Sequence, residues 1–174
     1  MAAAGGKKST YIDDVFSTYL YTGNNAEYRS IVNGVDNTKG GLVWFKGRNL
    51  SISNILSDSA SGITKHLSSD TTAAQVSPTY PYISSLQNNG FLLRGGTSSG
   101  GNVSGRDYAS WNFRKAPGFF DIVTWTGTGS YRTLDHSLGC IPGFIMLKQT
   151  SGTENWICWQ RSFGTANYIK LNST

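Results

Sequence analysis

Two short stretches of this sequence contain residue types that hydrolases use for nucleophilic catalysis. Residues 96–100 (Gly-Thr-Ser-Ser-Gly) have the spacing of a nucleophile elbow, in which a serine sits on the turn between a strand and a helix. More Gly, Asn and Ser residues follow, so the sequence predicts a loop where the elbow needs a helix. Residues 135–137 (Asp-His-Ser) contain the three triad residue types, but neighbouring side chains of an extended chain point to opposite faces and cannot hydrogen-bond in series. We therefore predict that the protein is not an enzyme.

Acidic residues and cysteines are the other candidates for chemistry. Asp13 and Asp14 could contribute to a calcium site, but no spaced loop of oxygen ligands accompanies them, and a charged edge guarding a strand is the better interpretation. Cys140 and Cys158 lack metal-ligand spacing, and each lies in an apolar run, which favours two buried free thiols. The sequence indicates neither a metal site nor a cofactor.

Aromatic side chains carry the remaining functional signal. They make up 13% of the chain, and five of them are tryptophans. Their ordinary role is core packing, but outward-facing rings can stack on sugars or form a protein interface. Trp156 and Trp159 have opposite parity, so a regular strand would place them on opposite faces and one of the two is the better candidate for exposure. The candidate interface or sugar-stacking residues are Trp111, Trp125, Trp156 and Trp159.

The elements that must position these rings are strands. Gly, Ser, Thr and Asn are abundant, and the bulky residues are mostly Tyr, Phe, Trp, Ile and Val, which suit a half-buried pleated surface. Alternation of side-chain types or short apolar runs predict strands at residues 14–22, 42–46, 91–94 and 107–114. The Gly- and Ser-rich residues 95–105 predict a mobile loop.

The chain also contains an internal repeat. Residues 16–23 (Phe-Ser-Thr-Tyr-Leu-Tyr-Thr-Gly) resemble residues 120–127 (Phe-Asp-Ile-Val-Thr-Trp-Thr-Gly). Each copy is followed by a glycine, four apolar residues and a lysine, at 41–46 and at 143–148. This pattern predicts a strand–connection–strand unit used twice, over about 14–48 and 118–150. We expect an antiparallel β-sandwich, jelly-roll-like, to which both units contribute.

Length and charge narrow the possible classes of protein. The 174 residues predict one domain at 11–174 after a flexible N-terminal arm at 1–10. The net charge of +5 is spread along the chain, which argues against nucleic-acid binding. The sequence lacks the apolar core of a signal peptide and any stretch long enough to span a membrane. Synthesis in the cytoplasm and a soluble product are expected.

Several ordered motifs resemble an uncharacterised domain of tailed phages, notably those of marine bacteria and cyanobacteria. The matching segments are residues 11–24, 40–46, 108–121 and 136–145, together with Lys148, Asn155 and Trp156. In that family the domain occurs in large virion proteins described as tail fibres or other structural components, often ahead of lectin-like modules. The resemblance brings no catalytic residues with it.

The resemblance implies a virion structural protein, a tail-fibre or particle-anchoring module located in the particle. Its expected partners are copies of itself, as a homotrimer, and other virion proteins, with Lys7 and Lys8 in the anchoring arm. The sequence leaves open a capsid-decorating protein and a carbohydrate-binding module that recognises host surface polysaccharide. It also leaves open head or tail location, and whether the 174 residues are part of a longer fibre.

Overall fold

The structure is a computed structural model of the whole chain, and it describes residues 10–95 and 100–173. The protein is nearly all β, as the composition predicts. A single turn of α-helix, α1 (Ile12–Val15), precedes the first strand, and two 3₁₀ turns, η1 (Asn37–Lys39) and η2 (Arg161–Phe163), interrupt the described chain later. No helix in these two ranges is long and apolar enough to cross a membrane.

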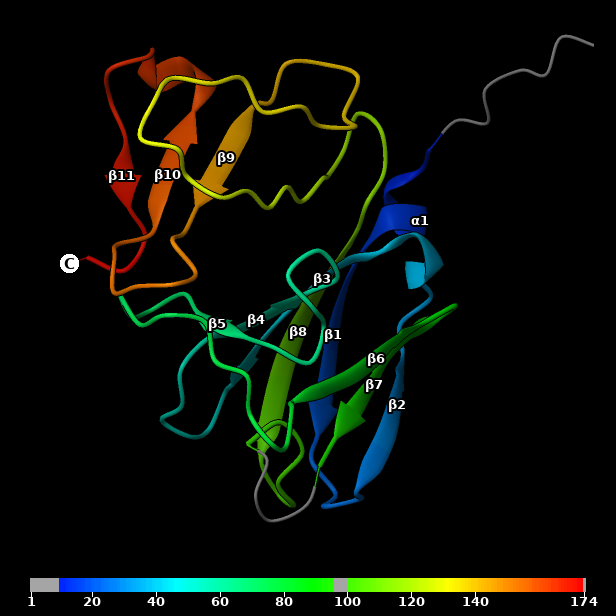
Figure 1. Cartoon of the computed structure of the whole chain (residues 1–174). Coiled ribbons are helices and arrows are strands. Elements are labelled where there is room, and N and C mark those ends of the chain that lie inside the picture. Colours follow the sequence, from blue (N-terminus) through cyan, green and yellow to red (C-terminus); the bar gives the residue numbers. More distant parts are fainter. Residues whose placement is uncertain (1–9, 96–99, 174) are drawn as a thin grey trace, which may run out of the picture.

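The strands form three antiparallel sheets (Figure 1). The first sheet has the order β1-β8-β3-β4-β5, the second β2-β7-β6 and the third β11-β10-β9. The strands of the first sheet are β1 (Phe16–Thr22), β8 (Asp107–Arg114), β3 (Gly41–Gly47), β4 (Ile55–Asp58) and β5 (Leu67–Ser68). The strands of the second sheet are β2 (Tyr28–Val32), β7 (Gly90–Arg94) and β6 (Ile83–Gln87). The strands of the third sheet are β11 (Ile169–Lys170), β10 (Ile157–Gln160) and β9 (Phe144–Leu147).

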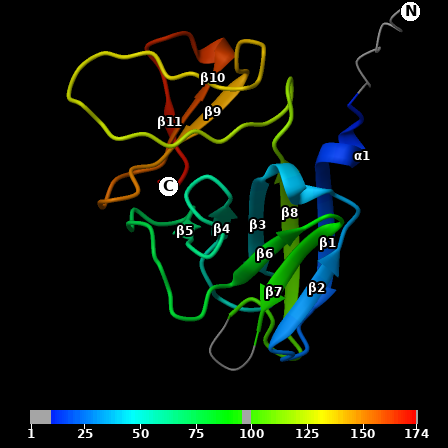
Figure 2. The same ribbon diagram turned by 45° about the vertical axis from the view of Figure 1, so that its right-hand side comes forward.

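The first two sheets pack face to face as a β-sandwich, which confirms the predicted fold class. The third sheet lies on the side of β4 and β5, away from the second sheet (Figures 1 and 2). Strands predicted at 42–46, 91–94 and 107–114 are β3, β7 and β8. The strand predicted at 14–22 begins at residue 16, because residues 12–15 form α1.

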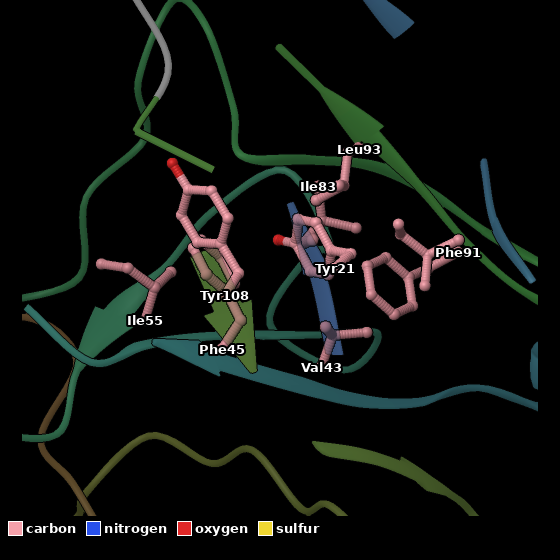
Figure 3. Close-up of a cluster of buried hydrophobic side chains, with 9 residues drawn as sticks. Tyr21, Val43, Phe45, Ile55, Ile83, Phe91, Leu93 and Tyr108 are labelled. Atoms are coloured by element: carbon pink, nitrogen blue, oxygen red, sulfur yellow. The ribbon is translucent and has the colours of Figure 1, made fainter. Parts of the chain in front are cut away.

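The sandwich core consists of side chains that alternate along the strands. In β8, Tyr108 and Asn112 point inward and are 0% exposed, whereas Trp111 between them is half-buried on the other side. Each fully buried large apolar side chain contributes roughly 1.5–3 kcal/mol. The core cluster, shown in close-up in Figure 3, is formed by Tyr21, Ile31, Val43, Phe45, Ile55, Ile83, Phe91, Leu93 and Tyr108.

Two tyrosines at the centre of this core join β1 to β8. The Tyr21 and Tyr108 rings stack with their centroids 5.0 Å apart. Burial raises the pKa of both hydroxyls, and both are hydrogen-bonded. The Tyr21 hydroxyl donates to the carbonyl of Gly101 at 2.9 Å, and the Tyr108 hydroxyl accepts from the amide of Val103 at 3.2 Å.

Buried asparagines add a polar layer to the core that the sequence did not reveal. Asn112 Nδ2 donates to Asn37 Oδ1 at 3.0 Å, and Asn37 Nδ2 donates back to Asn112 Oδ1 at 2.8 Å. Asn37 Nδ2 also donates to the carbonyl of Gly90 at 2.7 Å, which ties the first sheet to the second. Buried amides paired in this way avoid the desolvation cost of unsatisfied polar groups.

The predicted loop at 95–105 is partly a structural clamp, so mobility is the wrong interpretation for its second half. Asn102 is 0% exposed. Its Nδ2 donates to Asn24 Oδ1 at 2.8 Å and to the Ala26 carbonyl at 3.0 Å, holding the turn between β1 and β2. A Gly- and Ser-rich composition indicates a flexible backbone, but it does not show that the side-chain amide of one residue, Asn102, anchors the loop.

Candidate interaction surface

The first sheet has one face that points away from the second sheet, and we call it the outer face. Strand pairing aligns its side chains in rows, and in one row Trp111 of β8 lies between Thr18 of β1 and Trp44 of β3. The Trp44 and Trp111 ring centroids are 5.9 Å apart, with the ring planes tilted by 57°. The outer face is formed by Phe16, Thr18, Leu20, Leu42, Trp44, Ala109, Trp111 and Phe113.

The second half of the chain covers this face unevenly. Over β3 and β4, Trp156 packs in a hydrophobic cluster that includes Trp44 and Met146. Phe113 stacks against Phe119, with centroids 6.4 Å apart, where the chain leaves β8. Over β1 no such cover exists in the described ranges, and Leu20 remains 61% exposed. The outer face is therefore closed at one side and open at the other.

The open side continues into the start of the chain. Tyr11 and Ile12, which precede β1, are 67% and 56% exposed. Tyr19 of β1 is 37% exposed, but it lies opposite the buried Ser110 and so on the other face of the strand. β1 is the last strand of its sheet, and within residues 10–95 and 100–173 only β8 pairs with it. An edge strand with exposed apolar side chains is a site where another chain can pack. We call Tyr11, Ile12 and Leu20 the α1–β1 surface.

A family model described as a domain of unknown function (DUF7483) matches residues 11–119 and again residues 115–174. The chain belongs to this family. Neither a curated protein nor a solved structure matches it. The two matches meet at residues 115–119, directly after β8, where the sandwich ends and the second half of the DUF7483 chain begins.

The four candidate tryptophans do not come together in this DUF7483 chain. Trp111 is half-buried on the outer face, whereas Trp125 is 46% exposed in the segment after β8. Trp156 is 5% exposed, and its Nε1 donates to the Ser68 carbonyl at 2.8 Å, so its role is packing. Trp159 is half-buried and donates from Nε1 to the Gly164 carbonyl at 2.6 Å. Trp159 is thus the more exposed member of the Trp156 and Trp159 pair.

The second half of the chain exposes more large hydrophobic side chains for its length than the sandwich does. Half of the large hydrophobic side chains that are exposed among the described residues lie between 125 and 171, including Tyr131, Ile141 (76% exposed) and Phe144 (55% exposed). The expectation of two buried thiols is wrong for one of them. Cys158 is buried in β10, but Cys140 is exposed, because its apolar run crosses a surface loop between turns and is not part of a strand.

A shallow hollow of about 340 Å³ lies where the two halves join. Asp121 accepts a hydrogen bond from Lys115 Nζ at 2.8 Å and one from the Ser137 amide at 2.7 Å. Burial raises the pKa of Asp121, but these hydrogen bonds outweigh it and hold the pKa below its usual value. Asp135 and His136 also line the hollow. His136 Nδ1 accepts a hydrogen bond from the Leu138 amide at 3.3 Å, so this nitrogen stabilises the local turn of the chain.

Two tyrosines and an arginine form a surface cluster that the sequence does not predict. The pairing of β2 with β7 sets Tyr28 opposite Arg94. The Arg94 guanidinium lies over the Tyr28 ring, 5.7 Å from its centroid, and over the Tyr80 ring at 4.8 Å. Both rings are 51% exposed, and Glu27 lies 3.8 Å from Arg94. The register of β2 and β7 brings Tyr28 to Arg94, and Tyr80 comes from the segment before β6. A single sequence does not give that register.

Several sequence-based predictions concern residues whose structure is not described. Lys7 and Lys8 of the predicted arm lie outside the described residues, as does most of the 96–100 motif. Asp13 and Asp14 are exposed in α1. Within the described ranges, no three His, Cys, Asp or Glu side chains are grouped so that they could hold a metal ion.

Proposed function

We propose that this DUF7483 chain is a structural assembly module of a virus particle, with no catalytic role, and that it associates with copies of itself through the α1–β1 surface. The observation that carries the self-association is the open side of the outer face. Leu20 (61% exposed), Tyr11 and Ile12 are large apolar side chains beside a free strand edge of seven residues. Burying them against another subunit removes apolar area from water at about 25 cal/mol per Å².

The virus-particle part of the proposal is supported by the resemblance of the ordered motifs to a phage virion domain. A homotrimer suits that role, because fibres and other spike-like components are built on closed rotational symmetry. An edge strand and its flanking helix can repeat the same contact around a three-fold axis. Tail-fibre, particle-anchoring and capsid-decorating roles all use such an assembly surface.

Light scattering across a wide range of protein concentration tests the self-association. We expect a trimer that dissociates on dilution, and we expect Leu20→Ser to shift the mass to that of the monomer. Val32→Ser is the matched control, because Val32 is 56% exposed on β2, the edge strand of the second sheet. A monomer at every concentration, or equal effects of the two substitutions, would contradict the proposal.

The location is tested separately by mass spectrometry of purified virus particles from the source of this chain. We expect peptides of residues 11–174 at a fixed ratio to the major structural proteins. Their absence from particles that are intact by electron microscopy would show that the chain acts elsewhere.

Carbohydrate binding is a second candidate, favoured by the two half-exposed tyrosine rings around Arg94. Aromatic rings and a guanidinium can contact a sugar by stacking and by hydrogen bonds. A glycan array screened with the wild type and with Tyr80→Ala tests this role. Binding that Tyr80→Ala abolishes would support the module, whereas the absence of any signal, or a signal that Tyr80→Ala leaves unchanged, would remove this cluster as a sugar site.

A further inference from the structure

The third sheet has the same internal order as one half of the first sheet. β3, β4 and β5 follow one another in the chain and pair consecutively and antiparallel. β9, β10 and β11 do the same. β3 and β9 also occupy corresponding places in the internal repeat, since the first lies in Gly41–Lys46 and the second in Gly143–Lys148. On this basis β9 is the counterpart of β3.

What differs between the two sheets is the strand on the other side. In the first sheet β8 lies between β3 and β1 and pairs with seven residues of each. In the described parts of the chain, β9 pairs only with β10, so its second edge has no neighbouring strand. The segment that corresponds to β1, residues 120–126, forms no strand at all, although the repeat predicts one there.

The missing strand at 120–126 has a physical explanation. β1 is held in the first sheet only by its pairing with β8. A segment with the same sequence pattern but without a β8-like neighbour has no ladder to join, so it remains irregular. Its first residue, Phe120, forms an isolated bridge with Ala116 and packs against Phe113 of β8, with the ring centroids 5.3 Å apart. Figures 1 and 2 show this yellow-green segment passing beside the third sheet.

Side chains in the second copy of the repeat are more exposed than those at the corresponding positions of the first copy. Phe45 of β3 is 0% exposed, whereas its counterpart Leu147 of β9 is 38% exposed. Phe144 at the start of β9 is 55% exposed, and Trp125 in the 120–126 segment is 46% exposed. In the first sheet the rings of Tyr108 of β8 and Tyr82 pack against Phe45, whereas among the described strands no counterpart of β8 pairs with β9.

We propose that the free edge of β9, together with residues 120–126, accepts one added β-strand of the β8 type from another polypeptide segment. The occupant is an extended stretch of about eight residues that alternates aromatic with small or polar side chains, as Asp107–Arg114 does. It repeats an interface already present in this molecule, since β8 makes the same contacts with β1 and β3. Recognition through an added strand combines main-chain hydrogen bonds with alternate side-chain pockets.

One polar contact sets the orientation of that strand. In the first sheet Thr22 Oγ1 donates to Asp107 Oδ1 at 2.8 Å, at the end of the β1–β8 ladder. Thr126 occupies the position of Thr22 in the repeat. An acidic residue at the first position of the added strand therefore meets Thr126 and fixes the strand antiparallel to both neighbours. This proposal is independent of the α1–β1 surface, which lies on the first sheet.

The test uses the full chain and a synthetic peptide with the sequence of residues 106–116. Amide hydrogen exchange is measured with and without saturating peptide. We expect exchange at residues 120–126 and 144–147 to slow at least tenfold, with no change in β1. A peptide with proline at the positions of Ala109 and Trp111 is the control, because proline cannot donate to a strand ladder.

A second measurement addresses the possibility that the free peptide binds too weakly. The same eleven residues are fused after Thr174 through a flexible Gly-Ser linker, which raises their effective concentration to about the millimolar range. Protection of 120–126 and 144–147 in the fusion supports the proposal. Protection of the β1 or β2 edge in its place, or unchanged exchange at β9 in both experiments, overturns it.

Discussion

Replacing Asn112 by leucine tests whether the buried asparagine layer holds the two sheets together. Asn112 is 0% exposed. Its Nδ2 donates to Asn37 Oδ1 (3.0 Å) and the Leu42 carbonyl (3.3 Å), and its Oδ1 accepts from Asn37 (2.8 Å) and Asn33 (3.1 Å). Leucine has a similar volume, so the substitution removes these hydrogen bonds without leaving a large cavity.

The magnitude follows from the groups that lose their partner. Asn37 Nδ2 keeps its bond to the Gly90 carbonyl, but Asn37 Oδ1 becomes a buried acceptor without its donor, which costs about 1–3 kcal/mol. Loss of the Asn33 hydrogen bond adds about 1 kcal/mol. We expect the free energy of unfolding to fall by about 2–4 kcal/mol, which lowers Tm by about 5–15 °C for a chain of this size.

Urea unfolding followed by tryptophan fluorescence measures this change at one fixed protein concentration. Asn167→Leu is the matched control, because Asn167 is exposed and donates one hydrogen bond to the Phe163 carbonyl. We expect the control to lie within about 0.5 kcal/mol of the wild type. If Asn112→Leu unfolds at the same urea concentration as the control, the asparagine layer does not stabilise the sandwich and the reasoning is refuted.

Three further predictions concern charge, backbone and thiols. The pKa of Asp121 is held below its usual value in the folded state, so its carboxylate stabilises the protein at pH values above the usual pKa, and this stabilisation is lost as the pH falls through the folded pKa. Asp121→Asn should lower the free energy of unfolding at neutral pH and reduce its dependence on pH in the acid range, as measured by urea titrations at several pH values. Gly90 has φ +147°, and a Cβ there would meet the Ile31 carbonyl oxygen at 1.9 Å, so Gly90→Ala should destabilise by about 3 kcal/mol. Gly127→Ala, where nothing lies within 4 Å of the added Cβ, should leave stability unchanged, and urea unfolding of the two variants measures both effects. A thiol reagent should modify exposed Cys140 within minutes and buried Cys158, whose pKa burial raises, only on unfolding, and equal rates would contradict the fold around β10.

Period-2 alternation identified the strands whose two faces differ most. β8 has the predicted bounds, because Tyr108, Ser110 and Asn112 are buried and the residues between them are not. The four residues of α1 gave no helical signal, since a single turn is too short for a period of 3.6. At residues 120–126 the sequence has a strand pattern but the structure has no strand, because such a pattern forms a strand only where a neighbouring strand completes the hydrogen-bonded ladder.

The candidate surface was harder to predict than the fold. The number of aromatic residues pointed to an interface, but which rings are exposed depends on what packs over them. Trp156 is buried because a strand pair from the second half lies over β4 and β5, and Leu20 is open because nothing described covers β1. The contact between Arg94 and Tyr28 depends on strand register. These are long-range relations, and no local pattern in one sequence encodes them.

The central place of β8 determines when this protein can fold during synthesis. β1 leaves the ribosome well before its only pairing partner among the described strands, since Thr22 and Asp107 are separated by 85 residues. At about 5–20 residues per second, β1 stays unpaired for roughly 4–17 s after it is made. β3 can pair with β4 during this interval, but its other edge waits for β8 as well, so the first sheet is completed late. A nascent chain of this kind exposes an aromatic strand for seconds, and chaperone depletion should reduce its yield more than it affects proteins of the same length that fold from local hairpins.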